Sequence, residues 1–224
     1  MRRRRDDCVR APNRTGNLCD VSPSAGGIEF RPMVASDVGL VPIAHQGEES
    51  EVLARIAELG SSALLAFDRG RHVGQLQFRR YEPGTRSPHG VWDPLYWMDF
   101  VGRAPVVPFA TVSVCFCHVG QLDETNRRAQ QYLGRGIGSA LLDHFLAWAS
   151  QREFAAVIAK ATPARRSVME FLGGFPTRVY EDRGFEMTHT WMDTDLARAV
   201  RDRGLADDLD MEASTVACRV LRLR

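Results

Sequence analysis

A glycine-rich turn is the first part of this chain that could do chemistry: residues 134–138 read GRGIG, and an apolar-periodic segment over 139–151 follows. Glycine lets the backbone turn sharply and approach a ligand without a Cβ in the way. The first amides of a helix have no intrahelical acceptor, and the helix dipole adds positive charge at that end. The turn therefore predicts an anion site, for which phosphate is the natural ligand.

The turn has to be distinguished from other known phosphate-binding loops. A P-loop requires a lysine, and Lys160 is the only lysine of the chain, far from the turn. A dinucleotide-binding fingerprint requires a further glycine three residues after Gly138, where Leu141 stands. A turn that starts the helix without binding any ligand stays open as an alternative.

A second segment lies further along the chain: residues 179–185 read VYEDRGF, which predicts a helix end, a glycine cap at Gly184 and a strand start. Together the two segments resemble the GNAT superfamily of N-acetyltransferases. The family's cofactor loop commonly reads R-G-x-G-I-G-S-x-L-L, and its later segment often reads F/Y-Y-E-x-x-G-F. This chain has LGRGIGSALL over 133–142 and matches the later segment from Tyr180 onward. The resemblance covers about residues 28–224.

The resemblance implies acetyl-CoA as acyl donor, no metal, and a gap between the fourth and fifth strands that holds the pantetheine arm. Backbone groups of Cys117, His118 and Val119 would pair with the arm as if it were an added strand. The family commonly has Arg or Gln where Leu133 stands, so one side-chain contact to the diphosphate is missing. The link between Val119 and the turn is also longer than usual. The turn would hold the diphosphate through Leu133, Gly134, Arg135, Gly136, Ile137, Gly138 and Ser139.

The resemblance also implies that an amine attacks the thioester directly, with a backbone amide polarising its carbonyl. Tyr180 matches the tyrosine that often protonates the departing thiolate; the alternative is that its ring only packs at a helix end. Many relatives carry a glutamate on the fourth strand, but residues 111–119 contain no carboxylate. His118 is the only imidazole there and is a candidate base, directly or through water, or else a structural histidine. The amine could instead be bound by His89, Asp93 and Asp99.

The cysteines are odd in number and show no disulfide framework. Residues 115–117 read CFC, without the second pair that a zinc site needs, and in a strand Cys115 and Cys117 should share one face. No local base pattern supports either cysteine as an acyl-carrying nucleophile. We expect buried, reduced thiols in a cytoplasmic protein. The five cysteines are Cys8, Cys19, Cys115, Cys117 and Cys218.

Strand and helix patterns alternate along the chain, which predicts an α/β fold: a mixed, mostly antiparallel central sheet of about seven strands flanked by helices. Ser36 or Asp37 could cap a first helix, and Ser50 could cap the helix that follows. Strands are expected over 28–32, 63–67, 73–81, 111–119, 154–159, 185–192 and 215–223. Helices are expected over 51–59, 139–151, 166–183 (interrupted at 173–176) and 195–203.

Composition limits the remaining possibilities. A length of 224 residues fits one sizeable core, so residues 28–224 are expected to form a single domain after a disordered extension over 1–27. A net charge of +1 argues against a nucleic-acid partner, and no apolar run has the length of a membrane span. The proline-rich aromatic stretch over 82–109 favours a partly enclosed pocket.

Three functions therefore remain open on the sequence. The chain could acetylate a small-molecule amine, acetylate a protein or peptide amine, or bind acyl-CoA as a sensor without turnover. The departures at Leu133 and on the fourth strand make the third plausible. A homodimer is possible, since dimerisation is common in the family, although no interface pattern is visible in the sequence.

Overall fold

The structure is a computed structural model that describes residues 27–43, 46–81, 107–120, 128–206 and 211–223. One sheet of seven strands runs in the order β1-β2-β3-β4-β5-β7-β6, and its neighbours are antiparallel except for β4 and β5. This confirms the mixed, mostly antiparallel sheet that the sequence predicts. The strands are β1 (Ile28–Pro32), β2 (Ala63–Asp68), β3 (Arg71–Arg80), β4 (Thr111–Val119), β5 (Ala156–Ala161), β6 (Glu186–Met192) and β7 (Thr215–Arg222).

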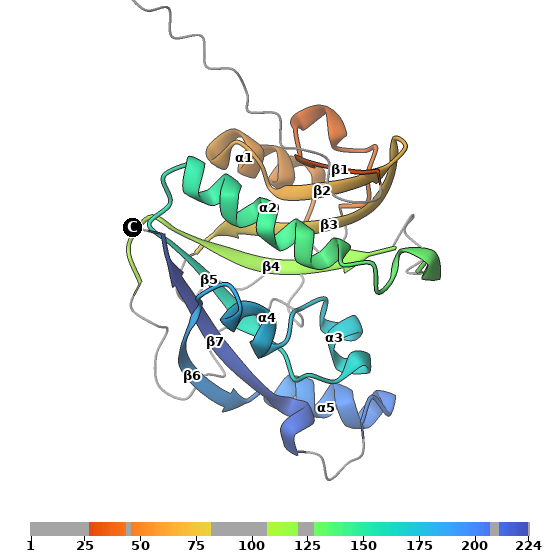
Figure 1. Ribbon diagram of the computed structural model, residues 1–224, viewed down its shortest axis with the longest axis vertical. Coiled ribbons are helices and arrows are strands. Elements are labelled where there is room, and N and C mark those ends of the chain that lie inside the picture. The colour runs from red at the N-terminus through yellow and green to blue at the C-terminus, as the bar shows by residue number, and fades with distance from the viewer. Residues whose placement is uncertain (1–26, 44–45, 82–106, 121–127, 207–210, 224) are drawn as a thin grey trace, which may run out of the picture.

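Helices cover both faces of the sheet (Figure 1). On one face, α2 and α4 lie over a core that includes Phe145 and Tyr180. On the other face, α1 packs through Val52 against β2, and α5 packs through Leu196 and Val200 against β5 and β7. The helices are α1 (Glu49–Leu59), α2 (Ile137–Gln151), α3 (Arg166–Leu172), α4 (Thr177–Glu181) and α5 (Thr194–Arg203), with 3-10 turns η1 (Ala35–Asp37), η3 (Gln130–Tyr132) and η4 (Met211–Ser214).

Two element boundaries differ from the prediction around α2. The helix starts at Ile137, two residues before the predicted start, because the left-handed Gly136 already ends the turn. The strand after it starts at Ala156 instead of residue 154. The Phe154 N–H donates to the Ala149 carbonyl at the end of α2, so Phe154 still belongs to the helix end and packs on Trp148.

The predicted helix caps near the N-terminus are wrong. The N-cap of α1 is Glu48, whose N–H donates to the carboxylate of Glu51 (2.9 Å), so Ser50 lies inside the helix. Asp37 ends the short turn η1, where its carboxylate accepts from the Val34 N–H (2.8 Å) and from Arg31 (2.7 Å). Asp37, which was expected to cap a helix, therefore forms an ion pair with Arg31 of the preceding strand instead.

The helical segment after β5 is interrupted as predicted, since α3 ends at Gly173 and α4 starts after Pro176. Nearly all of the predicted disordered extension and most of the aromatic stretch over 82–109 lie outside the described residues, as do His89, Asp93 and Asp99. Cys8 and Cys19 also lie outside them.

Candidate active site

The glycine-rich turn leads directly into α2 with its backbone facing solvent. Gly136 is the N-cap and has a φ of 75°, a left-handed conformation that glycine adopts without strain. The first helical hydrogen bond runs from the Ala140 N–H to the Gly136 carbonyl (2.9 Å). The amides of residues 137–139 come before this bond, so the helix itself offers them no acceptor. A Cβ on Gly136 would meet no atom of the described residues within 4 Å. An anion can therefore approach these amides from solvent, in front of the positive end of the helix dipole.

The residues before the turn anchor it to the sheet. Tyr132 is buried, and its hydroxyl donates a hydrogen bond to the carboxylate of Asp68 at the end of β2 (3.1 Å). The guanidinium of Arg135 lies 5.9 Å from the centre of the Tyr132 ring and remains exposed. Leu133 is half-buried and adds no charge, so the positive groups of the turn are its amides and Arg135.

A gap separates β4 from β5, as the sequence resemblance implies. The two strands pair only where Thr111–Ser113 lies beside Ala156–Ile158. Shortly after this pairing, β4 carries one extra residue: β3 pairs with Val114 and then with Phe116, which leaves Cys115 without a partner on β3. A bulge of this kind bends the strand that carries it, so β4 diverges from β5 beyond this point.

The same bulge overturns the prediction that Cys115 and Cys117 share one face. Cys117 packs in the core under α2, whereas Cys115 packs against the core on the opposite face. The strict alternation of a regular strand does not hold across an extra residue. Burial raises the pKa of the Cys117 thiol to about 12 and also raises the pKa of Cys115. Both stay protonated near neutral pH, which argues against either as a nucleophile.

A short stretch of chain, the Gly173–Pro176 segment, lies in the gap. The Cys117 N–H donates to the Gly173 carbonyl (2.6 Å), and the Thr162 N–H, just past β5, donates to the Phe175 carbonyl (2.9 Å). Gly173 has a φ of 60°, and a Cβ there would stand 2.1 Å from the Phe116 ring, so only glycine fits. The Cys117 amide, which was predicted to bind pantetheine, is therefore already hydrogen-bonded within the protein.

Tyr180 lies beside this segment. It is 1% exposed, and its ring packs edge-on against Phe175 (centroids 5.8 Å apart) and Phe185 (5.1 Å). Burial raises the pKa of its phenol well above the ordinary value, and the nearby Cys117 thiol acts in the same direction. Tyr180 therefore keeps its proton at neutral pH, which a general acid requires.

Arg183 joins the two sequence motifs in space. Its guanidinium donates to both carboxylate oxygens of Asp143 in α2 (2.6 and 3.0 Å) and to the Ser139 carbonyl (3.3 Å). It also donates to the Val179 carbonyl in α4 (2.8 Å). A two-bond guanidinium–carboxylate pair has a defined geometry, so α4 and Tyr180 are held in one place relative to the first turns of α2.

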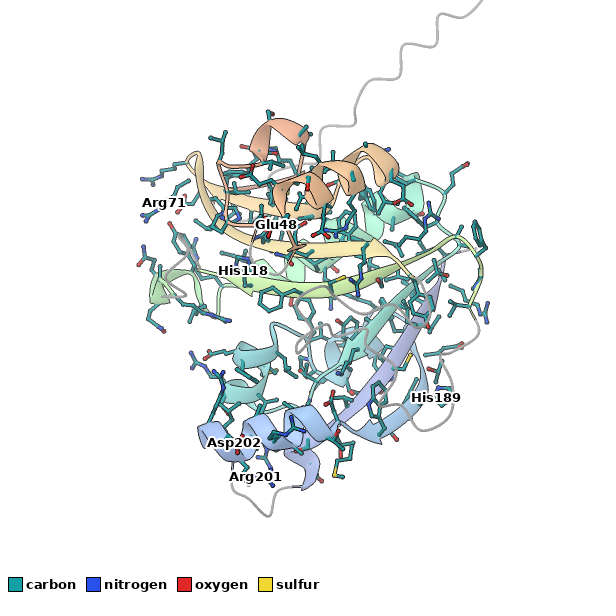
Figure 2. All side chains as sticks on the ribbon, turned by 180° about the vertical axis from the view of Figure 1, so that it is seen from behind. Glu48, Arg71, His118, His189, Arg201 and Asp202 are labelled. Carbon is teal, nitrogen blue, oxygen red and sulfur yellow. The ribbon has the colours of Figure 1, made fainter. Side chains whose placement is uncertain are left out.

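His118 belongs to a buried polar network on the α1 side of the sheet (Figure 2). The side-chain amide nitrogen of Gln75 lies 2.5 Å from the Pro42 carbonyl and 2.7 Å from Nε2 of His118. The Gln75 side chain therefore bridges the Pro42 carbonyl and Nε2 of His118 inside the protein. The neighbouring His72 ring is neutral at neutral pH, since burial lowers its pKa to about 4.

The structure thus brings some predicted site residues together and separates others. The glycine turn, Cys117 and Tyr180 lie around one gap, whereas the His118 side chain points away from it to the α1 side. Sequence reasoning missed Arg183 and the Gly173–Pro176 segment. The paired glycines at 173–174 were recognised only as a helix break. Among the described residues, no group of His, Cys, Asp or Glu could hold a metal ion, and no helix is long and apolar enough to cross a membrane.

Solved structures of other proteins share this fold. No protein-family model and no curated protein matches the chain. Among solved structures, an N-acetyltransferase from Staphylococcus aureus Mu50 is 13% identical with a TM-score of 0.50, covering 89% of this chain and 100% of that one. The Salmonella typhimurium protein yncA, described as an acetyltransferase with its cofactor acetyl-CoA, is 14% identical with a TM-score of 0.50, covering 89% and 95%. The chain therefore has the fold of the GNAT acetyltransferases, as the motifs predict.

Proposed function

We propose that this protein transfers an acetyl group from acetyl-CoA to a primary amine within a ternary complex. The observation that carries the proposal is a solvent-facing set of helix amides at Gly136 beside a gap between two diverging strands, with a protonated tyrosine at that gap. A diphosphate fits the amides, and an extended arm fits the edge of β4 that the Gly173–Pro176 segment occupies in this structure. The acetyltransferases of similar fold support the same reading.

The residues of this chain would hold the donor at two places. The amides of residues 137–139, together with Gly134 and Arg135, would bind the diphosphate. Along β4, the backbone of Cys117 and Val119 would pair with the pantetheine amides, and the Cys117 N–H would exchange its bond to Gly173 for one to the ligand. Binding the arm therefore requires the Gly173–Pro176 segment to move out of the gap.

When bound, acetyl-CoA supplies a thioester, whose C–S bond breaks as the amine nitrogen forms the new C–N bond. Tyr180 donates its proton to the departing sulfur and regains one from solvent, and the amine loses its extra proton to water. Nε2 of His118 is in contact with the side-chain amide of Gln75, and the ring is buried on the α1 side of the sheet. We therefore assign His118 to positioning β4, and not to accepting the proton directly.

A small-molecule amine is our preferred acceptor, and a protein or peptide amine is the alternative. The sensor without turnover remains a second candidate, because Leu133 and the carboxylate-free β4 lack groups that relatives use and because Gly173 occupies the Cys117 amide. Calorimetry with CoA tests the site itself, and we expect saturable binding. Absence of heat would refute both the enzyme and the sensor.

The enzyme and the sensor are separated by release of free thiol from acetyl-CoA in the presence of a panel of amines. We expect thiol release that depends on the amine added, with one acetylated product for each thiol. A protein that binds CoA but releases no thiol with small amines or with peptides would be a sensor. Release with peptides alone would move the assignment to a protein acceptor.

A further inference from the structure

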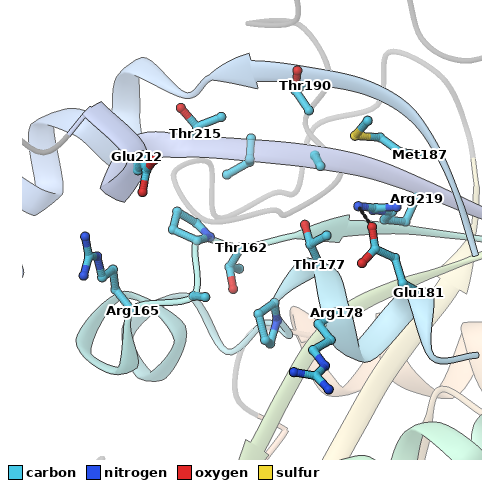
Figure 3. A pocket seen from close by; sticks show the side chains of 15 residues that line it. Thr162, Arg165, Thr177, Arg178, Glu181, Met187, Thr190, Glu212, Thr215 and Arg219 are labelled. Carbon is cyan, nitrogen blue, oxygen red and sulfur yellow. Dashed lines mark hydrogen bonds and ion pairs between the residues drawn. The ribbon is translucent and has the colours of Figure 1, made fainter.

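A second pocket lies on the other side of α4 from the gap (Figure 3). It has a volume of about 680 Å³ and is lined by β6 and β7, by α4, by the loop 162–165 between β5 and α3, and by Glu212 of η4. Within α4, Tyr180 packs towards the gap, whereas Glu181, the next residue, lines the pocket. Nothing in the proposed acetyl transfer uses this space.

The pocket wall contains two buried hydrogen-bond donors without an acceptor in the described part of the chain. Arg219 on β7 is 3% exposed; its terminal nitrogen donates to Glu181 (2.8 Å), but its Nε has no partner. Thr162 at the end of β5 is 5% exposed, and its hydroxyl also has no partner. A buried donor without an acceptor costs free energy, so both groups favour a ligand that accepts hydrogen bonds.

The charges around the pocket favour an anion. Arg165 and Arg178 lie on its rim, against Glu212, while the charge of Glu181 is balanced by Arg219 (Figure 3). The remaining lining includes Pro176, Met187 and Ala217, which are apolar, and Met187 is 56% exposed. A ligand with one acidic head and a short apolar body would satisfy both parts of the wall.

We propose that this pocket is a second ligand site, for a small carboxylate with an apolar body of a few carbons. The carboxylate accepts hydrogen bonds from Nε of Arg219 and from the Thr162 hydroxyl, and the apolar body lies on Met187 and Ala217. The proposal does not rest on the acetyl transfer, because neither Arg219 nor Thr162 takes part in it, although Pro176 at the end of the segment in the gap also lines the pocket.

Hexanoate is a suitable probe, with 1-hexanol as the uncharged control. Titration of the full chain, followed by calorimetry, should give saturable hexanoate binding with a Kd of about 1 mM or tighter. Hexanol should bind at least about tenfold more weakly, since it cannot place a charge beside Arg219. No saturation by hexanoate at roughly ten times that concentration would overturn the proposal. Equal binding of the two probes would also overturn it.

The Thr162→Val variant tests the site without threatening the fold. Valine keeps the shape and removes a buried hydroxyl that has no partner, so thermal stability should stay equal or rise. Hexanoate affinity should fall about tenfold, because a hydrogen bond to a charged group is lost. Thr188→Val is the matched control, since Thr188 is exposed on β6 outside the pocket lining, and it should bind like the unchanged protein. Wild-type affinity in Thr162→Val would show that hexanoate does not bind where we propose.

Discussion

The glycine turn and the gap between β4 and β5 are two parts of one proposed site, but they are prepared to different degrees. At the turn, Gly134, Arg135 and Gly136 are exposed, the amides of residues 137–139 precede the first helical hydrogen bond, and a Cβ on Gly136 would meet nothing within 4 Å among the described residues. In the gap, the Cys117 amide is already bonded to Gly173, and Phe175 packs against Tyr180. One region is open and made of backbone, whereas the other is filled by a segment of the chain itself.

This difference assigns separate tasks to the two regions. A preorganised cluster of amides binds an anion without rearrangement, so the turn should supply most of the affinity for CoA. The gap must first release the Gly173–Pro176 segment, so the apparent affinity is reduced by the fraction of molecules in which the gap is open. Binding at the turn should therefore offset the cost of opening the gap.

The largest effect should come from placing a negative charge in the turn. Gly136→Glu sets a carboxylate among the amides that bind the diphosphate, and repulsion between like charges should lower CoA affinity by more than about 100-fold. Gly70→Glu is the control: it has a similar φ (78° against 75°), and its Cβ position is likewise open, but it lies in the β2–β3 hairpin. Calorimetry should show normal CoA binding for that control. If both variants bind normally, the turn does not hold the diphosphate.

Removing the phenol at the gap should affect rate and not binding. Tyr180→Phe keeps the ring between Phe175 and Phe185 but removes the proton donor, so kcat should fall on the order of 100-fold. CoA affinity should remain near that of the unchanged protein. Tyr81→Phe is the matched control, since it also deletes the hydroxyl of a buried tyrosine but in the core on the other face of the sheet, and its kcat should stay near that of the unchanged protein. Thiol-release kinetics that are equal in Tyr180→Phe and wild type would remove the acid role.

Loosening the segment in the gap should strengthen binding. Phe175→Leu reduces the packing that holds the segment, which should cost about 1–2 kcal/mol of stability and raise CoA affinity roughly threefold to tenfold. Phe154→Leu is the control, since Phe154 is similarly buried but packs against Trp148 at the far end of α2. It should lose stability and leave CoA affinity unchanged. A loss of affinity in Phe175→Leu would mean that the segment supports the cofactor site instead of filling it.

The smallest effect should come from Gly138→Ala, at the point where the two regions meet. An added Cβ would stand 3.4 Å from the Phe175 ring and 3.8 Å from the Cys117 sulfur, and Gly138 does not need a left-handed backbone. CoA affinity should change by roughly twofold or less. A large loss in calorimetry would show that the turn and the gap are packed more tightly against each other than these distances indicate.

The sequence alone was sufficient for the parts of this protein that depend on local physics. The glycines at 134–138 followed by a periodic apolar segment predict a solvent-facing helix start, because backbone freedom and unpaired amides are local properties. Apolar patterns likewise predicted where the strands lie along the chain, and the glycines and proline at 173–176 predicted the break between α3 and α4. The gap between the fourth and fifth strands was also predicted, because the two motifs resemble a family whose fold has such a gap.

Only the tertiary structure decided what fills that gap and which side chains face it. The extra residue at Cys115 reversed the faces of the residues that follow, which no count of alternation could reveal. The contact between Cys117 and Gly173 joins residues far apart in the chain, as does the link from Arg183 to Asp143. Pairings of this kind depend on where the sheet brings its segments together, so they exist only once the chain has folded.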